Sequence, residues 1–159
     1  MTMRPLFVAV AALCVLSACE SSTSAQTTSA PDSNACPLPP FGNATDYHPR
    51  IDPNRFGPNV TNPWYPLRPG TTYRYTGLDG GDPVTDIVIV THQTRVIDSV
   101  RTRVVSDRLF QGGKVVERTH DYFAQDDCGN VWYFGEDTAE LNEAGKVVNT
   151  DGTWHSGVD

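Results

Sequence analysis

The chain is poor in positive charge and contains no long hydrophobic run. Its 159 residues include 12 Lys and Arg against 19 Asp and Glu, which gives a formal net charge of -7 at pH 7. An acidic surface repels phosphate backbones, so this composition disfavours nucleic-acid binding. The apolar run Leu6–Val15 is well short of the about 20 residues that a membrane-spanning helix needs. The sequence therefore predicts no nucleic-acid partner and no transmembrane helix.

Motifs for the common catalytic and cofactor chemistries are also missing. The chain has no G-x-S-x-G nucleophile elbow, no phosphate-binding G-x-x-x-x-G-K-[ST] loop and no G-x-G-x-x-G turn. Its histidines, His48, His92, His120 and His155, are scattered and lack the short spacings of a zinc site. We therefore predict no cofactor, no metal ligands and no catalytic residue, and favour a protein that is not an enzyme.

Cysteine is scarce, and the position of one cysteine is informative. Leu16-Ser17-Ala18-Cys19 follows the basic residue Arg4 and the apolar run. This arrangement resembles a bacterial lipoprotein signal peptide, residues 1–18, which is removed so that Cys19 carries fatty acyl chains such as palmitate. Several buried acyl chains hold a protein firmly on a lipid bilayer, at about 0.8 kcal/mol for each CH₂ group. We expect an exported protein, lipid-anchored to a membrane of the bacterial cell envelope.

Two cysteines remain for the mature chain. Cys36 and Cys128 are able to form one disulfide in an exported protein, and two unpaired thiols are the alternative. The loop between them is long, so a bridge would contribute about 3–5 kcal/mol on the chain-entropy model.

Composition divides the chain into segments. Residues 19–35 are rich in Ser and Thr and contain no aromatic residue, which predicts a flexible tether. Residues 36–70 contain most of the chain's 12 prolines, so we expect neither a helix nor a central strand there. Because this segment also contains aromatic residues, we expect it to wrap over the domain that follows, residues 71–159.

From Thr71 onward the pattern changes to short stretches rich in β-branched and aromatic residues, separated by turn residues. The expected strands are Thr71–Leu78, Val84–His92, Arg101–Gln111, Lys114–Gln125 and Asn130–Glu136. A further hairpin is expected around Asp151-Gly152. This pattern predicts an all-β fold, an antiparallel meander curled into a half-barrel or open barrel, with a β-sandwich as the alternative. Because the meander would end on an unpaired edge, we also expect the chain to be truncated at its C-terminus.

The expected loop Gly112-Gly113 gives a register that can be tested. With a two-residue loop, Arg108 lies opposite Glu117 and Asp107 lies opposite Arg118. Each facing pair of opposite charges stabilises a hairpin by about 0.2–1 kcal/mol, so the pattern predicts two salt bridges.

Several segments resemble an uncharacterised family of exported bacterial lipoprotein-like proteins. The matching segments are NPWYPL at Asn62–Leu67, PGT at Pro69–Thr71, Thr91–Ile97, Asp121–Gln125 and GNVWYFGEDT at Gly129–Thr138. The resemblance implies an envelope location and transfers no catalytic residue.

Acidic and aromatic residues provide the remaining candidates. The acidic residues near the aromatic segment are Asp121, Asp126, Asp127, Glu136, Asp137 and Glu140. The group at Asp126-Asp127 is read as turn chemistry, with a Ca²⁺ site as the alternative. Tyr75, Trp132 and Tyr133 are candidates for a ligand-binding surface, and core packing is the alternative for these rings.

Three functions stay open at this point. The first is a membrane-tethered envelope module that binds a small apolar ligand, a glycan or a partner protein. The second is a cell-surface hydrolase that uses Asp121, Glu136 and Asp137 for acid–base chemistry. The third is a purely structural envelope lipoprotein.

Overall fold

The computed structural model describes residue 47 and residues 49–158. The predictions for the lipoprotein signal, Cys19, the tether and Cys36 lie outside the described residues. No helix in the described part of the chain is long and apolar enough to cross a membrane.

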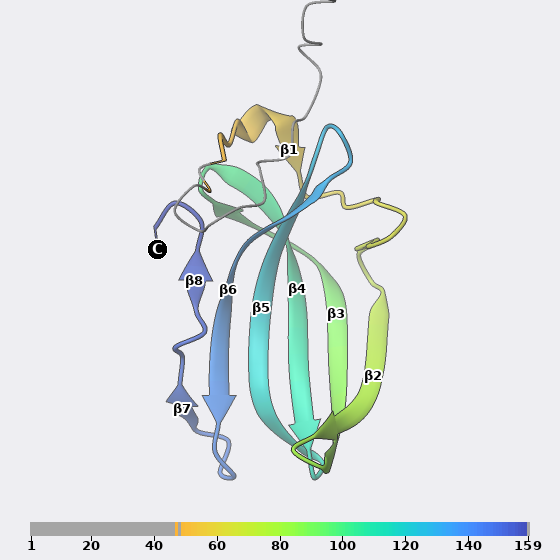
Figure 1. Ribbon diagram of the computed structural model, residues 1–159, viewed down its shortest axis with the longest axis vertical. Helices are drawn as coiled ribbons and strands as arrows, with labels where there is room; N and C mark the ends of the chain where they lie inside the picture. Colours follow the sequence, from red (N-terminus) through yellow and green to blue (C-terminus); the bar gives the residue numbers. More distant parts are fainter. Residues whose placement is uncertain (1–46, 48, 159) are drawn as a thin grey trace, which may run out of the picture. The chain divides into compact units, whose positions relative to one another are not determined.

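The described chain is nearly all β (Figure 1). Among the described residues, the 3₁₀ turn η2 (Pro53–Arg55) comes before eight strands. The strands are β1 (Phe56–Gly57), β2 (Thr72–Asp79), β3 (Asp82–Ile97), β4 (Val100–Gln111), β5 (Lys114–Asp126), β6 (Val131–Leu141), β7 (Val147–Asn149) and β8 (Trp154–His155). They form one sheet in the order β2-β3-β4-β5-β6-β7, with β1 paired to β5 and β8 paired to β6. All of these pairs are antiparallel and the sheet does not close, which confirms the predicted open meander.

The β4–β5 hairpin has the predicted two-residue turn but not the predicted register. Gln111 pairs with Lys114, and Gly112 and Gly113 take the positive φ angles of 57° and 79° that such a turn requires. A β-bulge at Val116 then shifts the register, so that Arg108 lies opposite Arg118. The two predicted salt bridges are therefore wrong. The bulge instead leaves Arg108 and Arg118 on the face of the sheet opposite to that of Asp107 and Glu117.

The predicted hairpin around Asp151-Gly152 is also wrong. β7 and β8 each pair with β6 and do not pair with each other. The Thr153 hydroxyl accepts a hydrogen bond from the Thr138 backbone N–H at 3.0 Å, which fixes the connecting segment against β6. Gly152 fits there because it has no side chain: a Cβ atom would lie 2.6 Å from the Thr138 methyl group. Contacts with β6 thus outweigh the local turn signal.

Two apolar clusters pack on opposite faces of the sheet. One comprises Ile97, Val100, Val104, Tyr122, Ala124 and Phe134, and Ile51, Phe56 and Trp132 pack against it. The other comprises Val60, Leu67, Val90 and Val105, with Tyr73, Val88, Phe123 and Val131 against it. The proline-rich segment therefore covers part of both faces, through residues 51–56 on one and residues 60–67 on the other.

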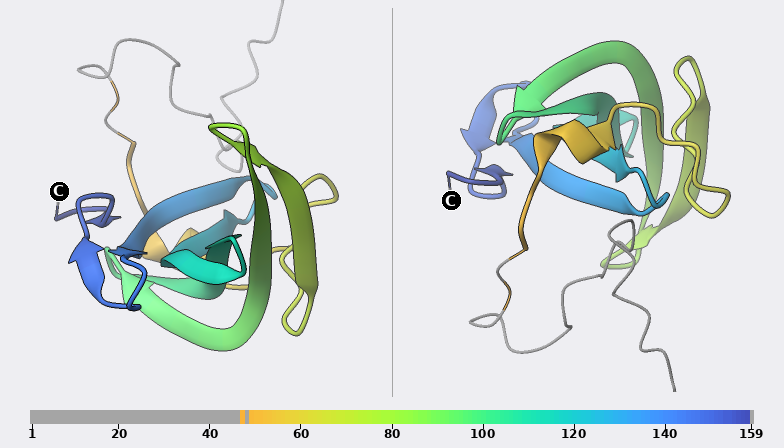
Figure 2. Two further views of the ribbon diagram at one scale, coloured as in Figure 1. Left: turned by 90° about the horizontal axis from the view of Figure 1, so that it is seen from below. Right: turned by 90° about the horizontal axis from the view of Figure 1, so that it is seen from above.

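Strand β3 is long and curves round the sheet, as the two views in Figure 2 show. Its register with β4 shifts between Val90 and Thr94. The buried Arg103 guanidinium donates to the backbone carbonyls of Thr91 and Gln93 at 3.3 Å, and to that of Pro58 at 3.1 Å. These bonds satisfy carbonyls in the irregular stretch. The bend brings the end of β3 to β8, where the Ser156 hydroxyl donates to the Asp98 carboxylate at 3.1 Å.

Candidate functional site

Six acidic side chains lie on one face of the sheet, which we call the acidic face. They are Asp86 on β3, Asp107 on β4, Glu117 and Asp121 on β5, and Glu136 and Glu140 on β6. Cross-strand partners share a face, and alternate residues of a strand share a face. The observed pairs Asp121–Glu136 and Glu117–Glu140, together with the pairing of Leu109 to both Asp86 and Glu117, place all six on the same side.

Asp121 and Glu136 are joined through a tyrosine. The Tyr133 hydroxyl lies 2.7 Å from Asp121 Oδ1 and 2.9 Å from Glu136 Oε2. A phenol has one proton to donate, so the second carboxylate is satisfied only while it holds a proton itself. Burial, together with the negative charge of Glu136, raises the pKa of Asp121 to about 6 against the hydrogen bond from Tyr133. Burial and the same two carboxylates raise the pKa of Tyr133.

Asp86 and Asp107 form a second acidic pair on this face. Burial, a hydrogen bond with Asp86 and the negative charge of that side chain raise the pKa of Asp107 to about 7. A carboxyl–carboxylate hydrogen bond exists only while one partner is protonated, which is why the pKa rises. The Asp86 Oδ1 atom is buried and has no hydrogen-bond donor among the described residues. This pair therefore lacks a donor whenever Asp107 is ionised.

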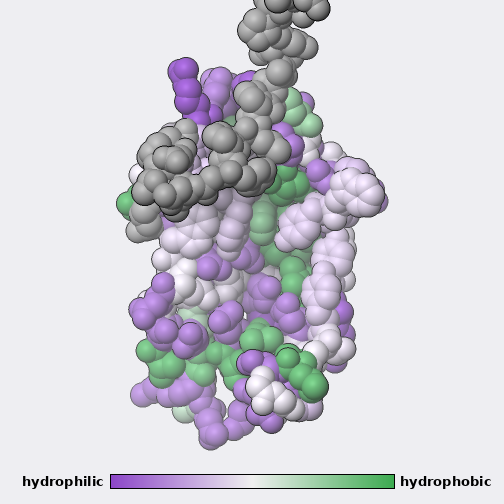
Figure 3. Space-filling view, viewed as in Figure 1, coloured by the Kyte–Doolittle hydropathy of each residue, from purple (hydrophilic) through white to green (hydrophobic). Residues whose placement is uncertain are grey.

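Within the described residues, none of the six side chains of the acidic face forms an ion pair. The ion pairs there join Arg55 to Asp127, Arg95 and His155 to Asp137, and Lys114 to Glu143, and none involves the six acidic residues. On the central strands, Arg74, Arg108, Arg118 and His120 alternate with residues of the acidic face and lie on the other side. Arg103 of β4 lies on the side of the acidic face, but its guanidinium donates to the backbone carbonyls of Pro58, Thr91 and Gln93. Figure 3 shows hydrophilic side chains over the middle of the sheet, beside a paler column of side chains along β2.

Aromatic rings border the acidic face. Tyr133 stacks on Phe123 with ring centroids 4.8 Å apart, and Tyr75 stacks on Tyr73 at 6.4 Å. Tyr75 and Tyr133 are 56% and 40% exposed, so both candidate rings are accessible on this face. The third candidate, Trp132, points to the opposite face. It packs edge-on against Phe56, and its indole N–H donates to Asp126 at 2.9 Å.

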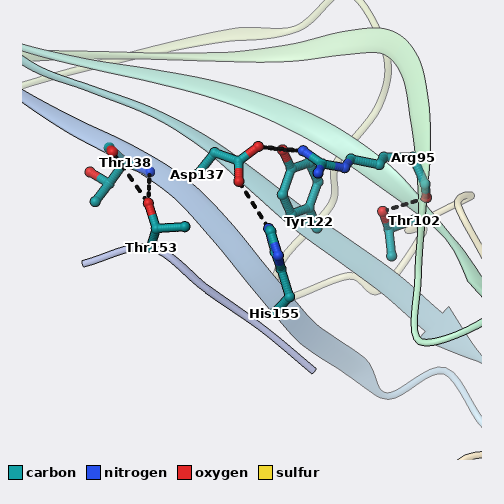
Figure 4. Close-up of polar contacts among 7 residues, drawn as sticks. All are labelled: Arg95, Thr102, Tyr122, Asp137, Thr138, Thr153 and His155. Carbon is teal, nitrogen blue, oxygen red and sulfur yellow. Dashed lines mark hydrogen bonds and ion pairs between the residues drawn. The ribbon is translucent and has the colours of Figure 1, made fainter. Parts of the chain in front are cut away.

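A second polar group, which we call the seam cluster, joins the end of β3 to β6 and β8 on the opposite face (Figure 4). It consists of Arg95, Tyr122, Asp137 and His155. The Asp137 carboxylate accepts from Tyr122 at 2.6 Å, contacts His155 Nε2 at 2.9 Å and forms a salt bridge with Arg95. Against the effect of burial, the hydrogen bonds from Tyr122 and Arg95 lower the pKa of Asp137. Burial and the Asp137 carboxylate raise the pKa of Tyr122 to about 12.

Asp137, one of the three carboxylates considered for a hydrolase, belongs to the seam cluster and lies on the face opposite to Asp121 and Glu136. Glu136 and Asp137 are sequence neighbours on β6, and neighbours on a strand point to opposite faces. The predicted convergence of Asp121, Glu136 and Asp137 is therefore wrong. Asp121 and Glu136 do converge, whereas Asp137 belongs to the contact that holds β3, β6 and β8 together.

The Asp126-Asp127 group organises a turn. The buried Asp126 carboxylate accepts hydrogen bonds from the backbone N–H groups of Cys128 and Asn130, and from the Asn130 and Trp132 side chains, at 2.8–3.0 Å. Asp127 forms a salt bridge with Arg55 at 2.8 Å. Within the described residues, no group of three or more His, Cys, Asp and Glu is placed to hold a metal ion. Cys128 is disulfide-bonded, and its pairing with Cys36 stays a prediction.

Sequence reasoning missed half of the acidic face and two members of the seam cluster. Asp86, Asp107 and Glu117 are far from the aromatic segment in sequence and join Asp121 only through the register of β3, β4 and β5. The spacing of Glu117 and Asp121 on β5, an even number of residues, was a usable signal, but the bulge at Val116 hides their alignment with Asp107 on β4. Arg95 and His155 both contact Asp137. Arg95 reaches Asp137 because β3 bends, and no local sequence motif predicts that bend.

Comparisons of the chain with protein-family models, with curated proteins and with solved structures gave no match. The site is therefore interpreted from its own chemistry.

Proposed function

We propose that this protein is a cell-envelope lipoprotein, anchored through lipid on Cys19, whose acidic face binds a ligand that carries a cationic amine. The observation behind this proposal is a set of six acidic side chains on one face, beside accessible tyrosine rings, and none of the six forms an ion pair within the described residues. The sequence left a small apolar ligand, a glycan and a partner protein as alternatives. The proposal restricts these alternatives to ligands that carry positive charge.

The physical argument is charge compensation. Ionised carboxylates that lie close together repel each other, and a cation between them removes that repulsion and forms short charge-assisted hydrogen bonds. The faces of Tyr75 and Tyr133 add cation–π attraction, worth about 0.5–1 kcal/mol at exposed sites. A neutral apolar ligand would instead bury the carboxylates without compensation, which is costly.

The test uses two oligosaccharides that differ in whether their amines are free or acetylated, and therefore in charge. Isothermal titration calorimetry of the full chain compares a glucosamine oligomer, which carries free amines, with the N-acetylglucosamine oligomer of equal length, which is neutral. We expect the glucosamine oligomer to bind at least about tenfold more tightly, because each 1.4 kcal/mol of added attraction is a factor of ten. The affinity of spermidine, whose amines stay protonated over this range, should rise from pH 5 to pH 8, as Asp121 and Asp107 ionise through pKa values of about 6 and 7.

Two variants locate the site. Asp107→Asn should weaken binding of the glucosamine oligomer, whereas Glu143→Gln should not, because Glu143 is an exposed loop residue paired with Lys114. Equal affinity for the two oligomers, or no change in Asp107→Asn, would refute a charge-selective site on the acidic face. Spermidine serves as a second cationic probe, which shows whether the sugar contributes to recognition.

A second candidate function is glycoside hydrolysis at Asp121 and Glu136. It is favoured by two carboxyl groups that share one tyrosine hydroxyl, one of them with a pKa raised to about 6, as a general acid requires. Release of reducing ends from the same two oligomers tests it. Turnover that is lost in both Asp121→Asn and Glu136→Gln would support the hydrolase, and binding without turnover would leave the first proposal in place.

A further inference from the structure

The segment that links the two faces presents a tryptophan to solvent. We call residues 62–66 the Trp64 loop. Trp64 is 92% exposed, the largest exposed fraction among the large hydrophobic side chains of the described chain. Burying such a ring would stabilise a protein by about 1.5–3 kcal/mol. Tyr65, next to it in the chain, is 47% exposed, so the loop presents two adjacent aromatic rings to solvent.

Several contacts fix the Trp64 loop against the rest of the domain. The Asn62 side chain accepts a hydrogen bond from the Trp64 backbone N–H at 2.9 Å and donates to the Gly129 carbonyl at 2.8 Å. Val60 and Leu67, at the base of the loop, are 1% and 2% exposed and form a β-bridge. Tyr65 packs edge-on against Phe123 at 5.5 Å. These contacts anchor the base of the loop and leave the indole ring of Trp64 in water.

The loop lies at the end of the sheet where the described chain begins. Figure 1 shows η2, β1 and the yellow coil that contains the Trp64 loop at the same end of the strands, away from the β4–β5 turn. Tyr47, the first described residue, follows Cys19 by 28 positions, and a chain of that length with the flexibility predicted for the tether would span about 30 Å on average. A lipid on Cys19 would therefore keep this end of the domain close to the bilayer.

We propose that the Trp64 loop docks on the surface of the lipid bilayer, with the indole ring of Trp64 and the ring of Tyr65 at the headgroup level. This inference rests on the lipid anchor of the proposed function. Trp and Tyr are the residues enriched at membrane–water interfaces, because each combines an apolar ring with a polar N–H or O–H group. The contact gives the tethered domain a fixed orientation, in which the strands point away from the membrane and the acidic face stays open to the aqueous side.

Quenching by brominated lipid tests the position of Trp64. The lipidated full chain is reconstituted in phosphatidylcholine vesicles with bromine on the upper acyl carbons, and tryptophan emission is recorded. The chain has three tryptophans. We expect Trp64→Phe to lose most of the bromine-dependent quenching, and the matched control Trp154→Phe to keep it, because Trp154 packs edge-on against Tyr133 on the sheet. Unchanged quenching in Trp64→Phe would overturn the proposal.

A second measurement separates this inference from the anchor. Flotation of wild type against Cys19→Ser tests the lipid anchor alone, and a wild type that does not float refutes the anchor. In the unlipidated Cys19→Ser chain, partitioning onto excess phosphatidylcholine vesicles should fall about tenfold when Trp64→Ser is added, since each 1.4 kcal/mol is a factor of ten. Equal partitioning of these two chains overturns bilayer docking, and would leave a protein as the partner of Trp64.

Discussion

Glu136 and Asp137 are neighbours in sequence and lie in two different chemical environments. Asp137 receives hydrogen bonds from Tyr122 and a salt bridge from Arg95, and these lower its pKa. Glu136 shares one tyrosine hydroxyl with Asp121, whose pKa is raised to about 6. The alternation of a β-strand is sufficient to produce this contrast. One carboxylate of the pair stabilises the fold, and the other belongs to a surface whose charge is left for a ligand.

The contrast identifies which carboxylates are structural. A carboxylate whose donors come from three different strands ties those strands together, because its loss leaves several donors unpaired. A group of carboxylates without a cation lowers the stability of the folded state at neutral pH, so its presence calls for a function. The largest effects on stability are therefore expected at the seam cluster, and the largest effects on binding at the acidic face.

Asp137→Ala tests the structural side of the comparison and should have the largest effect. It leaves Arg95, Tyr122 and His155 without their shared acceptor. Hydrogen bonds to charged groups contribute about 1.5–3 kcal/mol, so we expect the free energy of unfolding to fall by about 2–3 kcal/mol. Urea denaturation followed by circular dichroism measures the change. Asp151→Ala, at an exposed turn, is the control, and an equal effect of the two substitutions would contradict a structural role for Asp137.

Gly135→Ala tests the pairing of β6 with β8, which positions His155 beside Asp137, through the backbone. A Cβ atom at Gly135 would lie 2.3 Å from the Trp154 carbonyl oxygen, and its φ of 133° is one that side chains disfavour. We expect β8 to separate from β6 and the free energy of unfolding to fall by about 2 kcal/mol. Hydrogen exchange of the Ser156 amide, which donates to the Phe134 carbonyl at 2.9 Å, should accelerate. Gly77→Ala is the matched control, because nothing lies within 4 Å of its added Cβ.

The sequence predicted the fold well, because strand patterns and turn residues are local signals. It placed the two-residue turn at Gly112-Gly113, which the structure confirms. It failed where one extra residue shifts the strand register. The bulge at Val116 places Arg108 opposite Arg118, so the two expected salt bridges do not form and the charges lie on two different faces. It also failed at the seam cluster, because Arg95 reaches Asp137 only through the bend of β3, a property of the whole sheet.

Asp107→Asn tests the acidic side of the comparison through pH. The pKa of Asp107 is raised to about 7, so the stability that its protonated form provides is complete below its ordinary pKa of about 4 and is lost as pH rises through 7. Asn does not titrate. Relative to wild type, the variant should therefore gain stability between pH 5 and pH 8, by about 1 kcal/mol once solvent screening of this half-exposed group is allowed for. Urea midpoints at both pH values measure it.

The opposite sign is expected for Asp137, which makes the two faces distinguishable in one pH profile. Its pKa is lowered, so the stability that it provides is present above its ordinary pKa and is lost as pH falls through the lowered value. Wild type should therefore become more stable from pH 8 to about pH 5 and less stable in stronger acid. A profile that rises steadily up to pH 8, in wild type and in Asp107→Asn alike, would show that the carboxylates of the acidic face do not repel each other.

Lys114→Ala should have the smallest effect. It tests whether an ion pair alone is enough for a carboxylate, here that of Glu143, to stabilise the fold. Lys114 and Glu143 lie 3.8 Å apart, with side chains 60% and 95% exposed. Exposed pairs contribute about 0–1 kcal/mol, because water screens the charges and two long side chains lose freedom. We expect a change below about 0.5 kcal/mol in the urea midpoint assay, which would separate this pair from Asp137, where burial and donors from three strands act together. A loss near that of Asp137→Ala would mean that ion pairing by itself, and not its setting in the sheet, decides which carboxylates hold the fold.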